Sequence, residues 1–311
     1  MTDRTECVQC GQPTVVTVGR AAGREACRTC QAVIRCRSAG RLRLAARLGP
    51  LDASALVRPV FRQSWWRAAY RRRLDHALST VPLYRERSAP WQPPAEPLTA
   101  EDLELNEYRI CPFSRPWNPR REPSLWTGRP EGLSEVLRTT RALRAVRTVL
   151  EFREALVDWP RLGLVGYGTL LSDRARVRSD RWRLYHNLGV LDGARGPVAI
   201  VGGSVDLESL RSGMSAGPTA PITWLACRAL GDGPGTELAL VRDRHLGYVA
   251  ARDPRCGAVH VNWRSYYVRP IDGGLVWTDL RRSRPTLVDV YAGPGWKLAT
   301  CPEHRVPALV P

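Results

Sequence analysis

Lysine is almost absent from this chain of 311 residues. Lys297 is the only lysine among 47 lysine and arginine residues, and the formal net charge is +17. Arginine pairs bidentately with phosphate, so this charge is typical of a protein with a polyanionic partner such as nucleic acid. The alternative is a coding bias that replaces lysine by arginine throughout, because the arginines are spread along the whole chain. The charge alone does not choose between the two.

Long apolar runs are also missing. No segment approaches the roughly 18 consecutive apolar residues of a transmembrane helix, so no membrane partner is expected. The N-terminal string MTDRTEC contains acids and a cysteine where a signal peptide requires an apolar core. A cytoplasmic location with reduced thiols is the resulting expectation. The hydrophobic share of 43% and charged share of 25% are typical of a folded globular protein.

The first forty residues contain two matched pairs of cysteines separated by sixteen residues. They are Cys7, Cys10, Cys27 and Cys30. Two residues between thiolates allow one turn to present both sulfurs to a tetrahedral zinc ion. A strand predicted over residues 13–18, between the pairs, completes the layout of a zinc ribbon. Residues 1–40 are therefore predicted to be a zinc ribbon, whose Zn²⁺ is structural because four cysteines leave no coordination position open.

Two cysteine–histidine pairs near the end of the chain form a second candidate ligand set. Cys256 precedes His260 by four positions, and Cys301 precedes His304 by three. Two thiolates and two imidazoles are a reasonable tetrahedral set for zinc. The alternative is a pair of free thiols beside two histidines with ordinary hydrogen bonds. We therefore consider a second structural zinc site at these four residues.

Between these ends the pattern is helical first and rich in β-strands later. The helices are predicted over residues 51–78, 98–103 and 134–159. The strands are predicted over residues 162–169, 198–202, 222–227 and 237–242. Thr99 is expected to cap the second helix, because Asp102 stands three residues further on. The fold class is therefore α/β with a β-rich C-terminal part.

Two adjacent tryptophans, Trp65 and Trp66, lie among arginines in the first predicted helix. The expectation is that one of them is in the core and the other covers it. Stacking on nucleic-acid bases is the alternative, because exposed aromatic rings beside arginines are typical of such surfaces.

Five short strings follow one another along the chain: VPLYRE (81–86), LTAEDL (98–103), GAVHVN (257–262), GLVWTDL (274–280) and CPEHRVPAL (301–309). Their order resembles the phenylacetate–CoA ligase branch of the adenylate-forming superfamily. Three parts are therefore expected: the zinc ribbon over 1–40, a helical segment with a proline-rich linker over 41–97, and, as the resemblance implies, an adenylate-forming-like α/β core over 98–311. Some members of that branch carry a structural zinc between the third and the last of these strings.

The groups that bind ATP in that family are largely replaced here. Its phosphate loop is rich in glycine because backbone N–H groups must approach phosphate closely; Thr127 and Gly128 are the remnant. Leu246 stands where the family has an acid for Mg²⁺, and Gly293 where it has an acid for the ribose, with Asp289 as the nearest acid. The chain also reaches its last residue where the domain with the adenylating lysine would begin. These losses argue against ATP and Mg²⁺ as cofactors.

The expected function is that of a degenerate adenylate-forming-like protein, without assigned catalytic residues. It would be a non-catalytic accessory or binding subunit in a biosynthetic or modification pathway. Its partner would be an intact adenylate-forming homologue, another pathway enzyme or a substrate peptide. One alternative is an atypical ATP-dependent carboxylate-activating ligase completed by another polypeptide. The other is a zinc-ribbon protein that binds nucleic acid.

Overall fold

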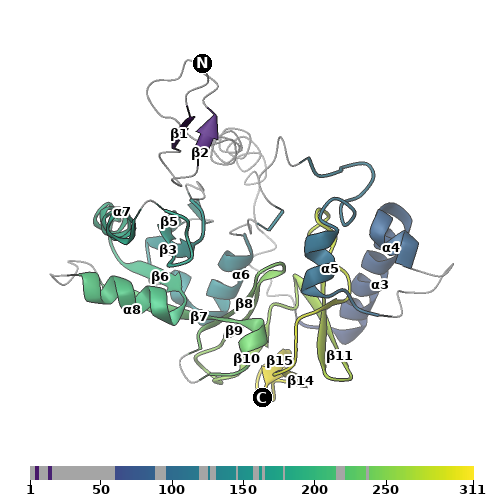
Figure 1. The fold of residues 1–311 in the computed structure, drawn as a ribbon. Helices are drawn as coiled ribbons and strands as arrows, with labels where there is room; N and C mark the ends of the chain where they lie inside the picture. Colours follow the sequence, from purple (N-terminus) through teal and green to yellow (C-terminus); the bar gives the residue numbers. More distant parts are fainter. Residues whose placement is uncertain are drawn as a thin grey trace. The chain divides into compact units, whose positions relative to one another are not determined.

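The computed structural model of the chain describes residues 4–6, 13–15, 60–87, 96–118, 125–126, 131–144, 146–156, 161–162, 165–177, 179–214, 221–235 and 238–311 (Figure 1). The chain divides into two compact units. The first unit consists of Met1–Arg58, Pro119–Pro123 and Ala145–Leu225, and the second of Pro59–Asn118, Ser124–Arg144 and Ala226–Pro311. Within the described ranges, none of the helices has the length and hydropathy needed to span a bilayer.

The first unit is built on parallel strands with helices between them. Its strands are β1 (Arg4–Glu6), β2 (Pro13–Val15), β3 (Thr148–Arg153), β4 (Arg161–Leu162), β5 (Val165–Leu171) and β6 (Val198–Gly202). β3 lies between β5 and β6 and is parallel to both, and β4 pairs antiparallel with β5. Helices α7 (Asp180–Asp192) and α8 (Ser204–Gly213) follow β5 and β6. β1 and β2 form an antiparallel pair.

The second unit contains two sheets. The strands of the larger one are, in spatial order, β7 (Ile222–Ala229, of which the part from Ala226 lies in this unit), β8 (Leu240–Asp243), β9 (Gly247–Arg252), β10 (Val259–Val261), β15 (Pro307–Val310) and β14 (Lys297–Thr300). β7 and β8 are parallel, and the other pairs are antiparallel. The smaller sheet is antiparallel and consists of β11 (Tyr266–Ile271), β12 (Gly274–Asp279) and β13 (Val290–Tyr291). The fold is therefore mixed α/β, as predicted.

The helices of the second unit pack around this β structure. They are α3 (Gln63–Thr80), α4 (Pro82–Arg87), α5 (Ala100–Leu105) and α6 (Glu131–Thr140), with 3-10 turns η1 (Ala142–Arg144) and η2 (Leu230–Asp232). Trp66 on α3 is 5% exposed and donates its Nε1–H to the Tyr266 carbonyl at 2.8 Å. Trp65 beside it is 44% exposed. The prediction that one tryptophan of the pair is in the core is thus confirmed.

A buried carboxylate joins α3 to the smaller sheet. Asp289 is 5% exposed and has a left-handed φ of 49°. Its Oδ2 accepts hydrogen bonds from the Tyr70 hydroxyl at 2.9 Å and the Arg269 guanidinium at 2.8 Å. The Thr278 hydroxyl lies 3.4 Å from Oδ1 and accepts the Asp289 backbone N–H at 3.0 Å. Asp289 is therefore a structural residue of the core.

Several sequence predictions are confirmed at the level of single elements. The predicted capping box is present at α5: Thr99 Oγ1 accepts the Asp102 N–H at 3.1 Å, and Asp102 accepts the Thr99 N–H at 2.9 Å. β6 has the predicted limits. The other predicted strands overlap β4, β5, β7 and β8. The first predicted helix corresponds to α3.

The long helix predicted over residues 134–159 is wrong. α6 ends at Thr140, and the next residue, Arg141, has a φ of 64°, which is outside the helical region. After η1 the chain enters β3, where all residues but the first are buried. A parallel strand that is covered on both faces contains apolar residues at successive positions. Its hydrophobic pattern therefore cannot be distinguished from that of a buried helical segment.

Candidate metal centre

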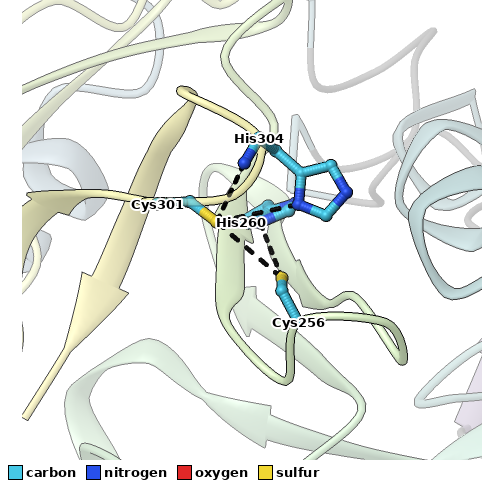
Figure 2. A group of neighbouring side chains, drawn as sticks. All are labelled: Cys256, His260, Cys301 and His304. Atoms are coloured by element: carbon cyan, nitrogen blue, oxygen red, sulfur yellow. Dashed lines mark hydrogen bonds between the residues drawn. The ribbon is translucent and has the colours of Figure 1, made fainter.

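Two hairpins of the larger sheet in the second unit bring the four C-terminal cysteine and histidine residues together. Cys256 lies in the turn between β9 and β10, and His260 lies within β10. Cys301 directly follows β14, and His304 lies in the turn that leads to β15. β10 pairs antiparallel with β15, with His260 opposite Ala308, so the two turns enter this short pairing from opposite ends and His260 lies between them in the sheet. Figure 2 shows the four side chains converging.

The ligand atoms of these side chains lie within 4.8 Å of one another. The Sγ atoms of Cys256 and Cys301 are 3.8 Å apart. The distance from Cys256 Sγ to His260 Nε2 is 3.3 Å, and that from Cys301 Sγ to His304 Nδ1 is 3.7 Å. The four residues are therefore close enough to bind one metal ion, as the sequence predicted.

Tight turns hold the two cysteines in place. In the first turn the Asp253 N–H donates to the Ala258 carbonyl at 2.9 Å, and Gly257 adopts a φ of 69°, which favours glycine. In the second turn the Cys301 N–H donates to the Val306 carbonyl at 2.8 Å. The His304 N–H also points to Cys301 Sγ, at 3.5 Å. Backbone hydrogen bonds thus stabilise the turns that carry the two cysteines.

An acidic side chain lies behind both imidazoles. Asp253 Oδ2 is 3.8 Å from His260 Nδ1 and 3.9 Å from His304 Nε2. Each ring therefore has one nitrogen towards the cysteines and the other towards the same carboxylate. A carboxylate behind a histidine is the usual device that orients a metal-binding ring and raises its basicity. Sequence reasoning missed Asp253, although an acid three residues before Cys256 was an available signal.

The surroundings change the pKa of each candidate ligand. Burial lowers the pKa of His260, which is 8% exposed, and so favours the neutral form that a metal requires. The hydrogen bond with Cys301 raises the pKa of His304. Burial works to raise the pKa of Cys301, but hydrogen bonds from the His304 backbone and ring outweigh it, so that this pKa is lowered. Burial raises the pKa of Cys256.

Three of the ligand spacings are close to those expected around a tetrahedral zinc ion. Bonds of about 2.3 Å to sulfur and about 2.0–2.1 Å to nitrogen place two sulfurs about 3.8 Å apart, and a sulfur and a nitrogen about 3.6 Å apart. The corresponding distances here are 3.8 Å between sulfurs and 3.3 and 3.7 Å between sulfur and nitrogen. Two thiolates and two imidazoles would fill all four positions of such an ion. The set is therefore suited to a structural metal.

The remaining predicted ligands lie outside the described residues. They are the zinc-ribbon cysteines Cys7, Cys10, Cys27 and Cys30, and the phosphate-loop remnant Thr127 and Gly128. Next to the latter pair, the Trp126 ring packs edge-on against His245, with centroids 4.5 Å apart. Among the predicted sites, the structure therefore describes the geometry of the Cys256, His260, Cys301 and His304 cluster.

Two positions that bear on ATP binding are described. Leu246, where the resemblance to the adenylate-forming family implies an acid, is fully buried in the turn between β8 and β9, and Tyr266 donates its hydroxyl to the Leu246 carbonyl. Asp289, the acid nearest to the expected ribose position, has hydrogen bonds to three side chains of the core. No protein-family model and no curated protein matches the chain.

Proposed function

We propose that this chain is a non-catalytic zinc protein of adenylate-forming-like ancestry, with a structural Zn²⁺ bound by Cys256, His260, Cys301 and His304. The supporting observation is the convergence of these four ligand atoms within 4.8 Å, from two hairpins of one sheet. Zinc is favoured over other divalent metals because two thiolates and two imidazoles in a tetrahedral set suit it best.

The ion would act as a cross-link between the β9–β10 and β14–β15 hairpins. Its four ligands come from turns far apart in the sequence, so binding would couple the end of the chain to the middle of the sheet. A structural site of this kind contributes its binding free energy to folding, because the unfolded chain does not hold the ligands together. A closed ligand set also gives the ion no position at which to activate water.

The accessory role rests on the positions that ATP chemistry would require. Nucleotidyl transfer depends on positioning and on neutralising phosphate charge. A buried leucine stands at the expected magnesium position, and the nearest acid to the ribose position is engaged within the core. These observations support a subunit without adenylating activity, and the role we propose for it is the binding of a partner enzyme or a substrate peptide in a biosynthetic or modification pathway.

Zinc content measured by mass spectrometry tests the metal site. Cys301→Ser should contain about one equivalent of zinc less than the unmodified chain, because a closed tetrahedral site tolerates the loss of a thiolate poorly. Cys227→Ser is the matched control, since Cys227 is a partly buried cysteine outside the centre. Comparing variants removes any contribution of the N-terminal cysteines. Equal zinc content in both variants would contradict the proposal.

The absence of adenylation is tested separately. The purified chain, supplied with ATP, magnesium and a panel of carboxylic acids, should release no pyrophosphate above a heated sample. ATP-dependent release that disappears on heating would overturn the accessory role and favour the ligase alternative. It would leave the metal site untouched, since the two assays share no component.

A further inference from the structure

The second unit also contains a cavity lined by aromatic and arginine side chains. Its volume is ≈ 590 Å³, within the range of about 300–1,000 Å³ that is typical of ligand pockets. It lies between the start of α3 and the loops that follow β10 and β12. Its aromatic and polar lining comprises Arg62, Ser64, Trp65, Trp263, Arg264 and Arg281. This cavity shares no residue with the metal centre.

Its aromatic wall is fixed on one side and open on the other. Trp263 packs edge-on against Phe61, with centroids 5.3 Å apart, and Phe61 packs in the same way against the buried Trp66 at 5.4 Å. Trp65 meets Trp263 at 6.0 Å and an interplanar angle of 87°, yet remains 44% exposed. An exposed indole held by a rigid neighbour can act as a stacking platform for a planar ligand.

The cavity also carries uncompensated positive charge. Arg281 forms an ion pair with Glu135, whose other oxygen accepts hydrogen bonds from Asn262 and Ser265. Neither Arg62 nor Arg264 forms an ion pair with any residue that the structure describes. No acid is among the residues that line the cavity. An anionic ligand would therefore find two guanidinium groups without an ion-pair partner among the described residues and no carboxylate in the cavity lining.

The environment of Arg264 points in the same direction. Arg264 is partly buried, and its guanidinium lies 5.5 Å from the centre of the Trp263 ring. Burial lowers its pKa, and the charges of Arg281 and Arg138 add to this effect against the opposing influence of Glu135. A bound anion would offset both the desolvation and the repulsion. The site thus combines an aromatic face with arginines whose positive charge a bound anion would stabilise.

We propose that this cavity binds a nucleotide, with its base stacked on Trp65 and its phosphate held by Arg62 and Arg264. A nucleotide carries both a flat aromatic group and a phosphate, and guanidinium groups pair bidentately with phosphate oxygens. A cationic ligand would meet three arginines, and an apolar one would leave their charge uncompensated. The nucleotide is either part of a single-stranded nucleic acid or free.

Fluorescence anisotropy of a fluorescein-labelled oligo-uridine tests the proposal on the full chain. Trp65→Ala should weaken binding by roughly 5- to 150-fold, the usual effect of removing one stacked base contact. Trp65→Phe should retain most of the affinity, because it keeps an aromatic face. Arg62→Ala should weaken binding and reduce the slope of log affinity against log salt by about one unit.

Two matched controls lie outside the cavity. Tyr185→Ala removes an exposed aromatic side chain from α7, and Arg72→Ala removes an exposed arginine from α3 itself. Both should bind the oligonucleotide within about twofold of the unmodified chain, since surface changes away from a site have small effects. Circular dichroism of each variant verifies that it is folded, which Trp65→Ala should be because Trp65 is exposed.

Competition distinguishes the two sources of the ligand. Displacement of the labelled oligonucleotide by uridine monophosphate at similar concentration assigns the cavity to free nucleotides. Displacement only by longer strands assigns it to single-stranded nucleic acid. The proposal is overturned if Trp65→Ala binds as tightly as Tyr185→Ala. It is equally overturned if the oligonucleotide shows no binding even at low salt.

Discussion

The carboxylate of Asp289 allows a sharp test of how the second unit is held together. Replacement by asparagine keeps the side-chain shape and the left-handed backbone, which asparagine tolerates. Tyr70 and Arg269 both donate to Oδ2, so the single oxygen of asparagine can occupy that position and its amide can face Thr278. The substitution therefore removes the charge and leaves the hydrogen-bond pattern possible.

The size of the effect follows from the two hydrogen bonds that lose a charged acceptor. Hydrogen bonds to charged groups contribute about 1.5–3 kcal/mol, against about 1 kcal/mol for neutral ones. The Arg269 side chain is 37% exposed, so solvent screens its share. A loss of about 2 kcal/mol is expected for Asp289→Asn, since each weakened bond accounts for about 1 kcal/mol.

Thermal unfolding followed by near-ultraviolet circular dichroism measures this loss. About 2 kcal/mol corresponds to a decrease in Tm of roughly 4–8 °C for a unit of this size. Asp272→Asn, in the exposed turn between β11 and β12, is the control and should change stability by less than about 0.5 kcal/mol. If the two variants unfold at the same temperature, the buried carboxylate does not stabilise the core in the way argued here.

Two further substitutions probe other parts of the fold. Thr99→Ala should lower stability by about 1 kcal/mol in urea unfolding, because it removes the side chain that caps α5 through the Asp102 N–H, whereas Thr99→Ser should not. Gly202→Ala should cost about 1–3 kcal/mol, because the added Cβ would lie 2.5 Å from Cδ2 of Phe152. Gly189→Ala, where no atom lies within 4 Å of the added carbon, should instead stabilise α7 by up to about 1 kcal/mol; the opposite order would refute the packing argument.

The sequence was informative where structure depends on neighbouring residues. The cap of α5 is set by Thr99 and Asp102, three positions apart, and both bonds of the box are present. The end of α3 before Pro82 follows from the stereochemistry of proline. Cys256 with His260 and Cys301 with His304 were grouped by ligand chemistry, and strand pairing brings them together.

The sequence was less informative where structure depends on distant partners. Residues 148–153 were predicted to be part of a helix, but they form the buried strand β3. Their burial on both faces depends on elements elsewhere in the chain, which the local sequence does not reveal. The cavity beside α3 joins Trp65 to Trp263, and neither periodicity nor spacing relates two residues so far apart. No structural role for Asp289 could be predicted from the sequence, because the Tyr70 and Arg269 side chains that donate hydrogen bonds to it are distant in the chain.

The scarcity of lysine has a practical consequence. Lys297 is exposed on β14, the edge strand of the larger sheet, in the hairpin that also carries Cys301. An amine-reactive dye therefore has one lysine side chain as its target in these 311 residues. A single fluorophore on Lys297 would thus report directly on the movement of this hairpin as metal is added or withdrawn.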